Sequence, residues 1–307
     1  MRRRLAGPLV AVALVASGCA GDEPEAAAPS EAPPSGPAPA VSTEESYRIL
    51  RDWTVRHNKA VASGVPAQWR DLATGGLEQP LIRRVWTYGK LPPSTRVALR
   101  NPAMYVPRLA GHPKWFAAAA VDDVDGPGRQ VLVVFQQAKP NDRWRAAHWL
   151  VFRGRPPALN FDREGYAVPT ADRSLAAGHS AFLTTGDASR FRPDGFTRRA
   201  RRPAPPRGWS MNSRYAPTRH PVFALRTGDG GSLVWYSVEQ RTTYRRAPRG
   251  RPATLPPDLR GALAQAKRLK AATVETTWIW LAIGYAPPRG PAHVIGESLH
   301  LTDVRAR

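Results

Sequence analysis

The sequence predicts an α+β fold in which two helix-plus-antiparallel-sheet halves pack as one body. Two observations lead to this prediction. Apolar residues recur at helical spacing over residues 43–63, and β-rich segments separated by Pro, Gly, Asn and Asp then follow one another. The second half, from about residue 209, shows the same types of segment again. Helices followed by runs of consecutive strands are typical of the α+β class.

The chain begins like an exported lipoprotein. Residues 1–18 combine a basic start with an apolar run that is too short to span a bilayer, as in a secretory signal peptide. The run leads into Ala16-Ser17-Gly18-Cys19, which contains the only cysteine of the chain. This motif resembles the bacterial lipobox, although Ala16 stands where leucine is commonest. The resemblance implies that Cys19 receives a diacylglycerol and becomes the first mature residue. The alternative is ordinary secretory cleavage beside an incidental cysteine.

Residues 19–42 are expected to be the lipidated cysteine followed by a disordered spacer. The spacer is rich in Pro and Ala and has almost no large apolar residue, so it cannot bury enough surface to fold. Such a segment extends by about 3 Å per residue. We therefore expect a protein anchored by lipid to the outer face of the cytoplasmic membrane. The Sec route fits the leader better than the Tat route, because no Phe-Leu-Lys-like sequence follows the twin arginines.

The rest of the chain is strongly basic. Three of the 45 basic residues lie in the leader and four of the 24 acidic residues lie in the spacer, so residues 43–307 carry a net charge of +22. Such a charge attracts anionic lipid or wall polymer, whereas export argues against nucleic acid as a partner. The excess of Arg over Lys, with much Ala, Pro and Gly, is also typical of a high-GC genome, which is the alternative explanation.

Local signals define the elements of the first half, residues 43–197. Ser42 and Glu45 have capping-box spacing and predict a helix that Gly64 ends. Pro80 predicts the first turn of a second helix. Four strands are expected, at 103–109, 114–121, 130–138 and 144–152. A further helix should begin near Thr170 or Asp172 and stop at Gly186.

Residues 198–208 read as a linker, and residues 209–307 as a C-terminal α+β half. A segment that begins at His220 repeats part of the one at His112: both run His-Pro, an aromatic residue, a Gly-rich turn and a strand that ends in Gln. A basic helix is expected at 256–272, followed by strands at 272–285 and 293–304.

Two resemblances follow from these segments. The first half resembles the nuclear-transport-factor-like fold, in which a curved sheet wraps round helices. The run Tyr105-Val106-Pro107-Arg108, with Pro113, Trp115 and Phe116, after a lipoprotein start is similar to a family of actinobacterial lipoproteins of uncharacterised function. The resemblance brings no activity and no catalytic residues.

The histidines offer one candidate pocket. His57 shares a helical face with apolar residues, and in a fold of this kind it can point into the concave sheet. Trp53, Tyr105 and Trp115 are the other candidate pocket residues. The alternative is that His57 is a core histidine bonded to a neighbour. We expect no metal and no cofactor, because no histidine pair has zinc-site spacing and no phosphate-binding motif is present.

A second candidate site consists of basic residues. Lys267 and Arg268 should face solvent on the helix at 256–272, and Arg199, Arg201 and Arg202 crowd the linker. These five residues are candidates for anion binding; interaction of the basic helix end with the helix dipole is the alternative. The leading hypothesis is therefore a non-catalytic binding or scaffold lipoprotein of the cell envelope. The rival hypothesis is a hydrolase or isomerase with a site in the concave sheet.

Overall fold

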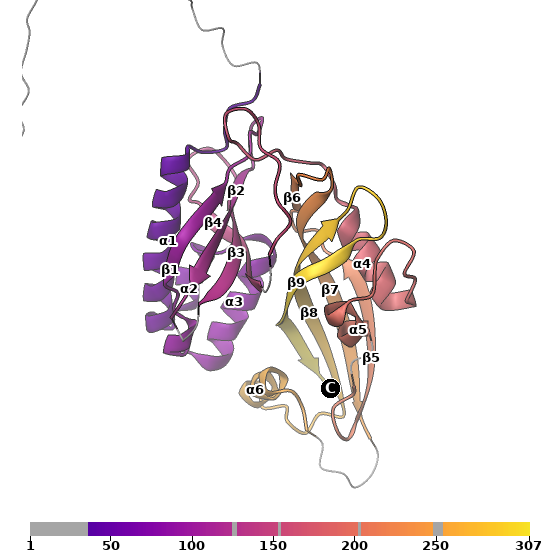
Figure 1. Ribbon diagram of the computed structural model, residues 1–307. Coiled ribbons are helices and arrows are strands. Elements are labelled where there is room, and N and C mark those ends of the chain that lie inside the picture. Colours follow the sequence, from indigo (N-terminus) through magenta and orange to yellow (C-terminus); the bar gives the residue numbers. More distant parts are fainter. Residues whose placement is uncertain (1–35, 125–127, 153–154, 202–203, 248–253) are drawn as a thin grey trace, which may run out of the picture. The chain divides into compact units, whose positions relative to one another are not determined.

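The computed structural model describes residues 36–124, 128–152, 155–201, 204–247 and 254–307. Pro37–Arg307 form one compact unit (Figure 1). Its first part begins with the helices α1 (Thr43–Ser63), α2 (Pro66–Arg70) and α3 (Gly75–Tyr88) and the 3₁₀ turn η1 (Pro93–Thr95). The predicted ends of α1 are confirmed: Oγ of Ser42 accepts a hydrogen bond from the amide of Glu45, and Gly64 adopts the left-handed conformation.

Helix α3 begins earlier than predicted. Pro80 lies inside it and is buried, although proline usually occupies the first turn of a helix. Tertiary packing outweighs this preference. At Gly76 the helix lies so close to the second sheet that an added Cβ would be 2.8 Å from Cδ2 of Leu281.

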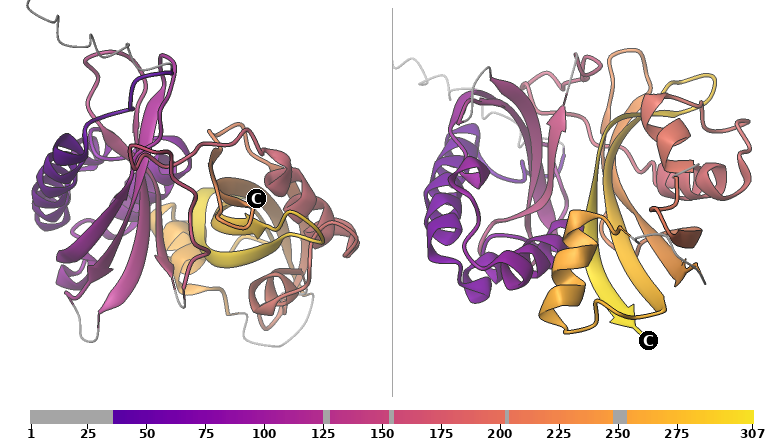
Figure 2. Two further views of the ribbon diagram at one scale, coloured as in Figure 1. Left: turned by 45° about the horizontal axis from the view of Figure 1, so that its top comes forward. Right: turned by 90° about the horizontal axis from the view of Figure 1, so that it is seen from below.

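Four strands follow in an antiparallel meander: β1 (Leu99–Tyr105), β2 (Lys114–Asp122), β3 (Arg129–Gln137) and β4 (Arg145–Phe152). The predicted strands 114–121, 130–138 and 144–152 match within one residue at each end, whereas β1 begins and ends four residues before the predicted 103–109. Figures 1 and 2 show α1 running along one side of this first sheet.

The second sheet has five strands. They are β5 (Trp209–Pro217), β6 (Phe223–Arg226), β7 (Ser232–Arg246), β8 (Thr273–Ala286) and β9 (His293–Ala306), in the order β5-β7-β8-β9 with β6 paired to β7. Three helices accompany it: α4 (Ser174–Thr185), α5 (Gly195–Arg201) and α6 (Pro257–Gln265). Helix α4 stops before Gly186, as predicted, while α5 occupies the start of the segment 198–208 that we expected to be a linker.

Around residues 233–236 of β7 the second sheet is covered on both faces. Leu233 and Trp235 of β7 join the core that lies against the first sheet, whereas Val234 and Tyr236, the alternate residues, join a second core with α4. Helix α4, which the sequence analysis grouped with residues 43–197, therefore packs on the second sheet. The α+β class and the packing of both parts into one body are confirmed, whereas the nuclear-transport-factor-like fold of the first part stays a prediction.

Candidate anion-binding surface

Trp53 and His57 face the first sheet but belong to its core. The Trp53 ring is 1% exposed, its Nε1 donates to the carbonyl of Leu72 at 2.9 Å, and the Trp149 ring stacks on it at 5.3 Å. His57 is 6% exposed, with its ring 4.8 Å from that of Trp53. Desolvation by burial lowers the pKa of His57 to about 4, so its ring is neutral at pH 7. These rings fill the space in which the enzyme hypothesis placed a site.

Tyr105 and Trp115 lie on the other face of the same sheet. Phe116 pairs with Phe135, whose ring contacts Trp53, so Phe116 points toward α1. Trp115 is the next residue along the strand and points the opposite way, where its ring lies 5.3 Å from that of Phe223. Tyr105 pairs with Ala117 and shares this side. The four residues expected to line one pocket are thus divided between two faces of the sheet.

The basic helix expected at 256–272 is shorter than predicted, because α6 ends at Gln265. The amide of Lys267 donates to the carbonyl of Ala264 and the amide of Arg268 to that of Leu263, at 3.0 and 2.8 Å. These two bonds form a Schellman termination, with Lys267 at φ 55° in the position that glycine usually occupies. Lys267 and Arg268 are exposed, as predicted, but they lie in a turn. Leu269, the next residue, is 50% exposed.

The side chains of the other three candidates, Arg199, Arg201 and Arg202, lie outside the described part of the structure. Arg199 and Arg201 belong to α5, whereas the whole of Arg202 lies outside the described residues. Their role in anion binding therefore stays a prediction.

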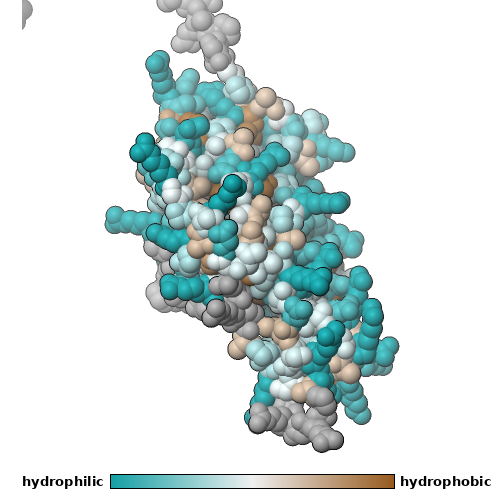
Figure 3. Space-filling view, turned by 90° about the vertical axis from the view of Figure 1, so that its right-hand side faces the viewer, coloured by the Kyte–Doolittle hydropathy of each residue, from teal (hydrophilic) through white to brown (hydrophobic). Residues whose placement is uncertain are grey.

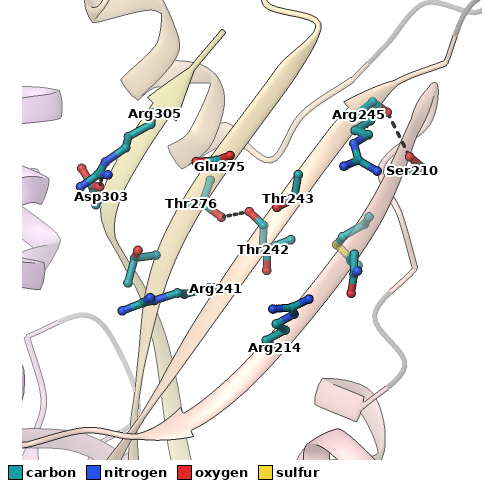
Figure 4. Close-up of a pocket in the computed structure, with 13 residues that line it drawn as sticks. Ser210, Arg214, Arg241, Thr242, Thr243, Arg245, Glu275, Thr276, Asp303 and Arg305 are labelled. Carbon is teal, nitrogen blue, oxygen red and sulfur yellow. Dashed lines mark hydrogen bonds and ion pairs between the residues drawn. The ribbon is translucent and has the colours of Figure 1, made fainter.

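The structure brings together a different set of basic residues, on the second sheet. Cross-strand pairing aligns Arg214 of β5 with Arg241 of β7, and Arg241 in turn with Thr277 of β8. Directly paired residues point to the same side, so these side chains share one face. We call this surface the arginine face. It comprises Ser210, Asn212, Arg214, Arg241, Thr243, Arg245, Glu275, Thr277, Asp303 and Arg305, which line a hollow of about 740 Å³ (Figure 4).

The charges of the arginine face are unevenly paired. Two of its arginines form ion pairs, Arg241 with Glu239 at 2.7 Å and Arg305 with Asp303 at 3.1 Å. The neighbouring Arg307 forms an ion pair with Glu275 of this face at 4.0 Å. Within the described residues, the exposed guanidinium groups of Arg214 and Arg245 form no ion pair. Arg214 also stands directly opposite Arg241, and like charges in that position repel each other.

This arrangement suits a ligand with more than one anionic group. Guanidinium groups bind phosphate and carboxylate through two parallel hydrogen bonds, and the neighbouring Ser, Thr and Asn side chains add further donors. Arg241 and Arg245 lie four residues apart on β7, which corresponds to about 13 Å along the strand. Figure 4 shows both of them projecting from β7 and Arg214 projecting from β5.

Hydrophilic side chains are spread over the face seen in Figure 3. The sequence analysis missed the arginine face, although a signal was present. Polar residues recur at every second position in "SMNSR" (210–214) and "RTTYRR" (241–246), as expected of strands with one solvent-exposed face. The strand at 209–217 was not predicted, and only the cross-strand register aligns Arg214 with Arg241.

The domain of unknown function DUF8094 matches residues 37–306. The chain belongs to this family. The DUF8094 match covers both sheets and therefore includes the arginine face.

Three relatives of this DUF8094 protein carry the name uncharacterized lipoprotein. One from Streptomyces coelicolor is 27% identical over 75% of this chain and 67% of its own length. One from Streptomyces avermitilis is 26% identical over 75% of this chain and 72% of its own length. A second from S. coelicolor is 27% identical over 86% and 85%. These findings confirm the resemblance to uncharacterised lipoproteins and support an exported lipoprotein. Among the described residues, no helix is both long and apolar enough to cross a membrane.

Proposed function

We propose that this protein is a lipid-anchored binding protein on the outer face of the cytoplasmic membrane, and that it binds an extended polyanion on the arginine face. The observation that carries the proposal is that the exposed guanidinium groups of Arg214 and Arg245 share one hollow and form no ion pair with another described residue. A ligand bearing phosphate or carboxylate groups neutralises both of them and relieves the repulsion between Arg214 and Arg241. The net charge of +22 on residues 43–307 favours the encounter.

Charge reversal tests this proposal. The chain from residue 20 onward, with Arg214→Glu and Arg245→Glu, should lose at least about tenfold in affinity for polyphosphate or polygalacturonate, because each charge-assisted contact between a guanidinium group and an anion contributes about 1 kcal/mol or more. Isothermal titration at low and high salt measures the loss. The affinity of the unaltered chain should fall as salt rises, since screening weakens the charge interactions.

A matched control separates the hollow from overall charge. Arg51 and Arg96 are exposed arginines of the first part and make no ion pair with other described residues. Their replacement by Glu changes the net charge by the same amount and should leave the affinity within about twofold, because distant exposed charges are screened. Equal losses of affinity in the two double variants would show that binding depends only on the net charge of the protein. The arginine face would then not be a binding site.

Lipid anchoring is proposed from the lipobox and supported by the names of the relatives. Cys19 lies outside the described residues. We expect Cys19→Ala to release the protein into the medium or to leave the precursor unprocessed, because the thiol is the acceptor of the lipid. Cell fractionation and mass spectrometry of the mature N-terminus measure this. The proposal is contradicted if the Cys19→Ala variant fractionates with membranes as the unaltered protein does and mass spectrometry finds no lipid on the unaltered protein.

A further inference from the structure

The side of the second sheet opposite the arginine face carries a hollow with aromatic walls. Gln240 and Arg241 are successive residues of β7, so their side chains point to opposite sides of the sheet. On the Gln240 side lies a hollow of about 500 Å³, which we call the aromatic hollow; its lining includes Met211, Tyr244, Trp278, Trp280 and Leu299 together with Gln240. Its volume lies within the range of ligand pockets, which is roughly 300–1,000 Å³.

The polar atoms in the floor of the aromatic hollow are paired with one another. Nε1 of Trp280 donates to Oε1 of Gln240 at 2.8 Å, and Nε2 of Gln240 donates to Oγ1 of Thr242 at 3.0 Å. Nε1 of Trp278 donates to Oγ1 of Thr276 at 2.7 Å. Both indole N–H groups are therefore engaged, and the rings offer hydrocarbon to a ligand. An apolar chain suits such a surface better than a sugar, whose hydroxyl groups lose free energy when they are buried without partners.

A second hollow, of about 250 Å³, adjoins the aromatic hollow. Both hollows are lined by Leu299 of β9 and by Asp258 in the first turn of α6. Helices α3 and α6 contact each other, and both contact β9, which is an edge strand of the sheet (right-hand view of Figure 2). The two hollows therefore meet at this edge of the second sheet, between the two helices.

One face of α3 makes the second hollow cationic. Pro80, Arg83, Arg84 and Thr87 are spaced three and four residues apart, so they share one face of the helix, and all four line the hollow. Within the described residues neither arginine forms an ion pair, and Nε of Arg83 is buried without a hydrogen-bond partner. A buried donor without a partner costs free energy, and an anionic group that accepts its hydrogen removes this cost. We call this second hollow the cationic hollow.

The other titratable groups leave positive charge in excess there. Among the described residues, Asp258 supplies the only carboxylate of the cationic hollow, and it accepts a hydrogen bond from the hydroxyl of Tyr88. His300 lines the hollow as well; burial, followed by the charge of Arg84, lowers its pKa to about 4, so its ring is neutral at pH 7. Glu297 lines the aromatic hollow, two residues before Leu299 on β9 and away from His300. The negative end of a ligand is therefore favoured at α3.

We propose that the two hollows together bind a single-chain amphiphile with an anionic head group, such as a long-chain carboxylate or an alkyl phosphate. The guanidinium groups of Arg83 and Arg84 bind the head group, and the chain passes Leu299 and lies against the rings of Trp280 and Trp278. Trp280 and Leu299 are paired across β8 and β9, which makes this path continuous. The proposal does not rest on the polyanion site of the arginine face.

Calorimetric titration with dodecanoate, below the concentration at which it forms micelles, tests the path of the chain. The chain from residue 20 onward should bind dodecanoate, and Leu299→Asp should weaken the binding at least about tenfold, because a carboxylate then lies between the two hollows and repels the ligand. Leu299 is 39% exposed, so the variant should keep its melting temperature. Leu269→Asp is the matched control: Leu269 is 50% exposed and lines neither hollow, and its replacement should leave the affinity within about twofold.

The head group is tested by a second variant and by changing the ligand. Arg83→Met keeps an apolar stem of similar length and removes the guanidinium group, so it should weaken dodecanoate binding about tenfold. Arg51→Met, at an exposed position of α1 outside both hollows, should not weaken it. Dodecyltrimethylammonium, which has a comparable chain and a cationic head group, should bind at least about tenfold more weakly than dodecanoate. Shorter carboxylates should bind about fourfold more weakly for each methylene group removed.

Four results would overturn the proposal. They are no binding of dodecanoate by the unaltered chain, equal binding of the anionic and the cationic amphiphile, equal losses in Leu299→Asp and Leu269→Asp, and equal losses in Arg83→Met and Arg51→Met. Dodecanoate binding that Arg214→Glu and Arg245→Glu abolish while Leu299→Asp leaves it intact also overturns it, because the arginine face then binds the carboxylate. The affinity of Leu299→Asp for polyphosphate should equal that of the unaltered chain, so that failure of one site is distinguishable from failure of the other.

Discussion

Lowering the pH from 6.5 to 5.5 is expected to remove about 4 kcal/mol from the free energy of unfolding, since four histidines of the unfolded chain, already half protonated at 6.5, each contribute about 1 kcal/mol. Burial lowers the pKa of His57, His179 and His300 to about 4 and that of His148 to about 3, from an ordinary value of 6.5. The unfolded chain therefore binds protons as the pH falls below 6.5, while the folded protein does not. Stability is fully present above 6.5 and falls by about 1.4 kcal/mol per histidine and pH unit down to the folded pKa.

Urea unfolding at a series of pH values measures this dependence. His148 is the most informative position, because it is fully buried and neither ring nitrogen has a hydrogen-bond partner among the described residues. Between pH 6.5 and about 3, the pKa of His148 in the folded protein, the free energy of unfolding of His148→Phe should depend less steeply on pH. The difference in slope should be about 1.4 kcal/mol per pH unit. A stability that is flat across this range would contradict the burial of the four rings.

Replacement of Trp53 by Ala is expected to cost about 3–5 kcal/mol of stability, as for other fully buried tryptophans. The substitution removes a ring that packs on Phe135 and Trp149, and it removes one of the two hydrogen bonds that the carbonyl of Leu72 accepts. Chemical denaturation measures the loss. Trp86→Ala, which truncates a tryptophan that is 56% exposed, should change the stability by less than about 0.5 kcal/mol.

The same variant distinguishes a core residue from a ligand-binding one. Under conditions in which Trp53→Ala remains folded, it should bind polyphosphate as the unaltered chain does, because the arginine face lies on the second sheet. An unchanged unfolding midpoint together with lost binding would falsify the assignment of Trp53 to the core and restore the pocket that the sequence suggested.

Elements with strong local signals could be predicted from the sequence. Helix α1 has its capping serine and its terminal glycine, and β3 has a continuous apolar run, so both were located within a few residues. Helix α3 was not, because its proline is compensated by close packing at Gly76 that involves a residue about two hundred positions away. Strand β5 was missed because it is a half-exposed polar edge strand.

The sites were harder to predict than the elements. Trp53 and Trp115 look alike in sequence, and only the strand register shows that they lie on opposite sides of one sheet. The arginine face depends on the pairing of β5, β7, β8 and β9, which local patterns do not determine. The exposure of Lys267 and Arg268 was predicted correctly, because a run of basic residues is exposed whatever the tertiary structure around it.

The division of β7 and β8 between two cores affects the order in which the chain can fold as it emerges N-terminus first. Phe223, Trp235 and Leu281 complete the core of the first sheet, yet they follow β4 by roughly 70 to 130 residues. A chain that emerges N-terminus first must leave one side of the meander uncovered until β8 has followed. Such long-range closure slows folding and exposes apolar strands in the meantime. The first sheet is therefore most prone to aggregation between the appearance of β4 and that of β8.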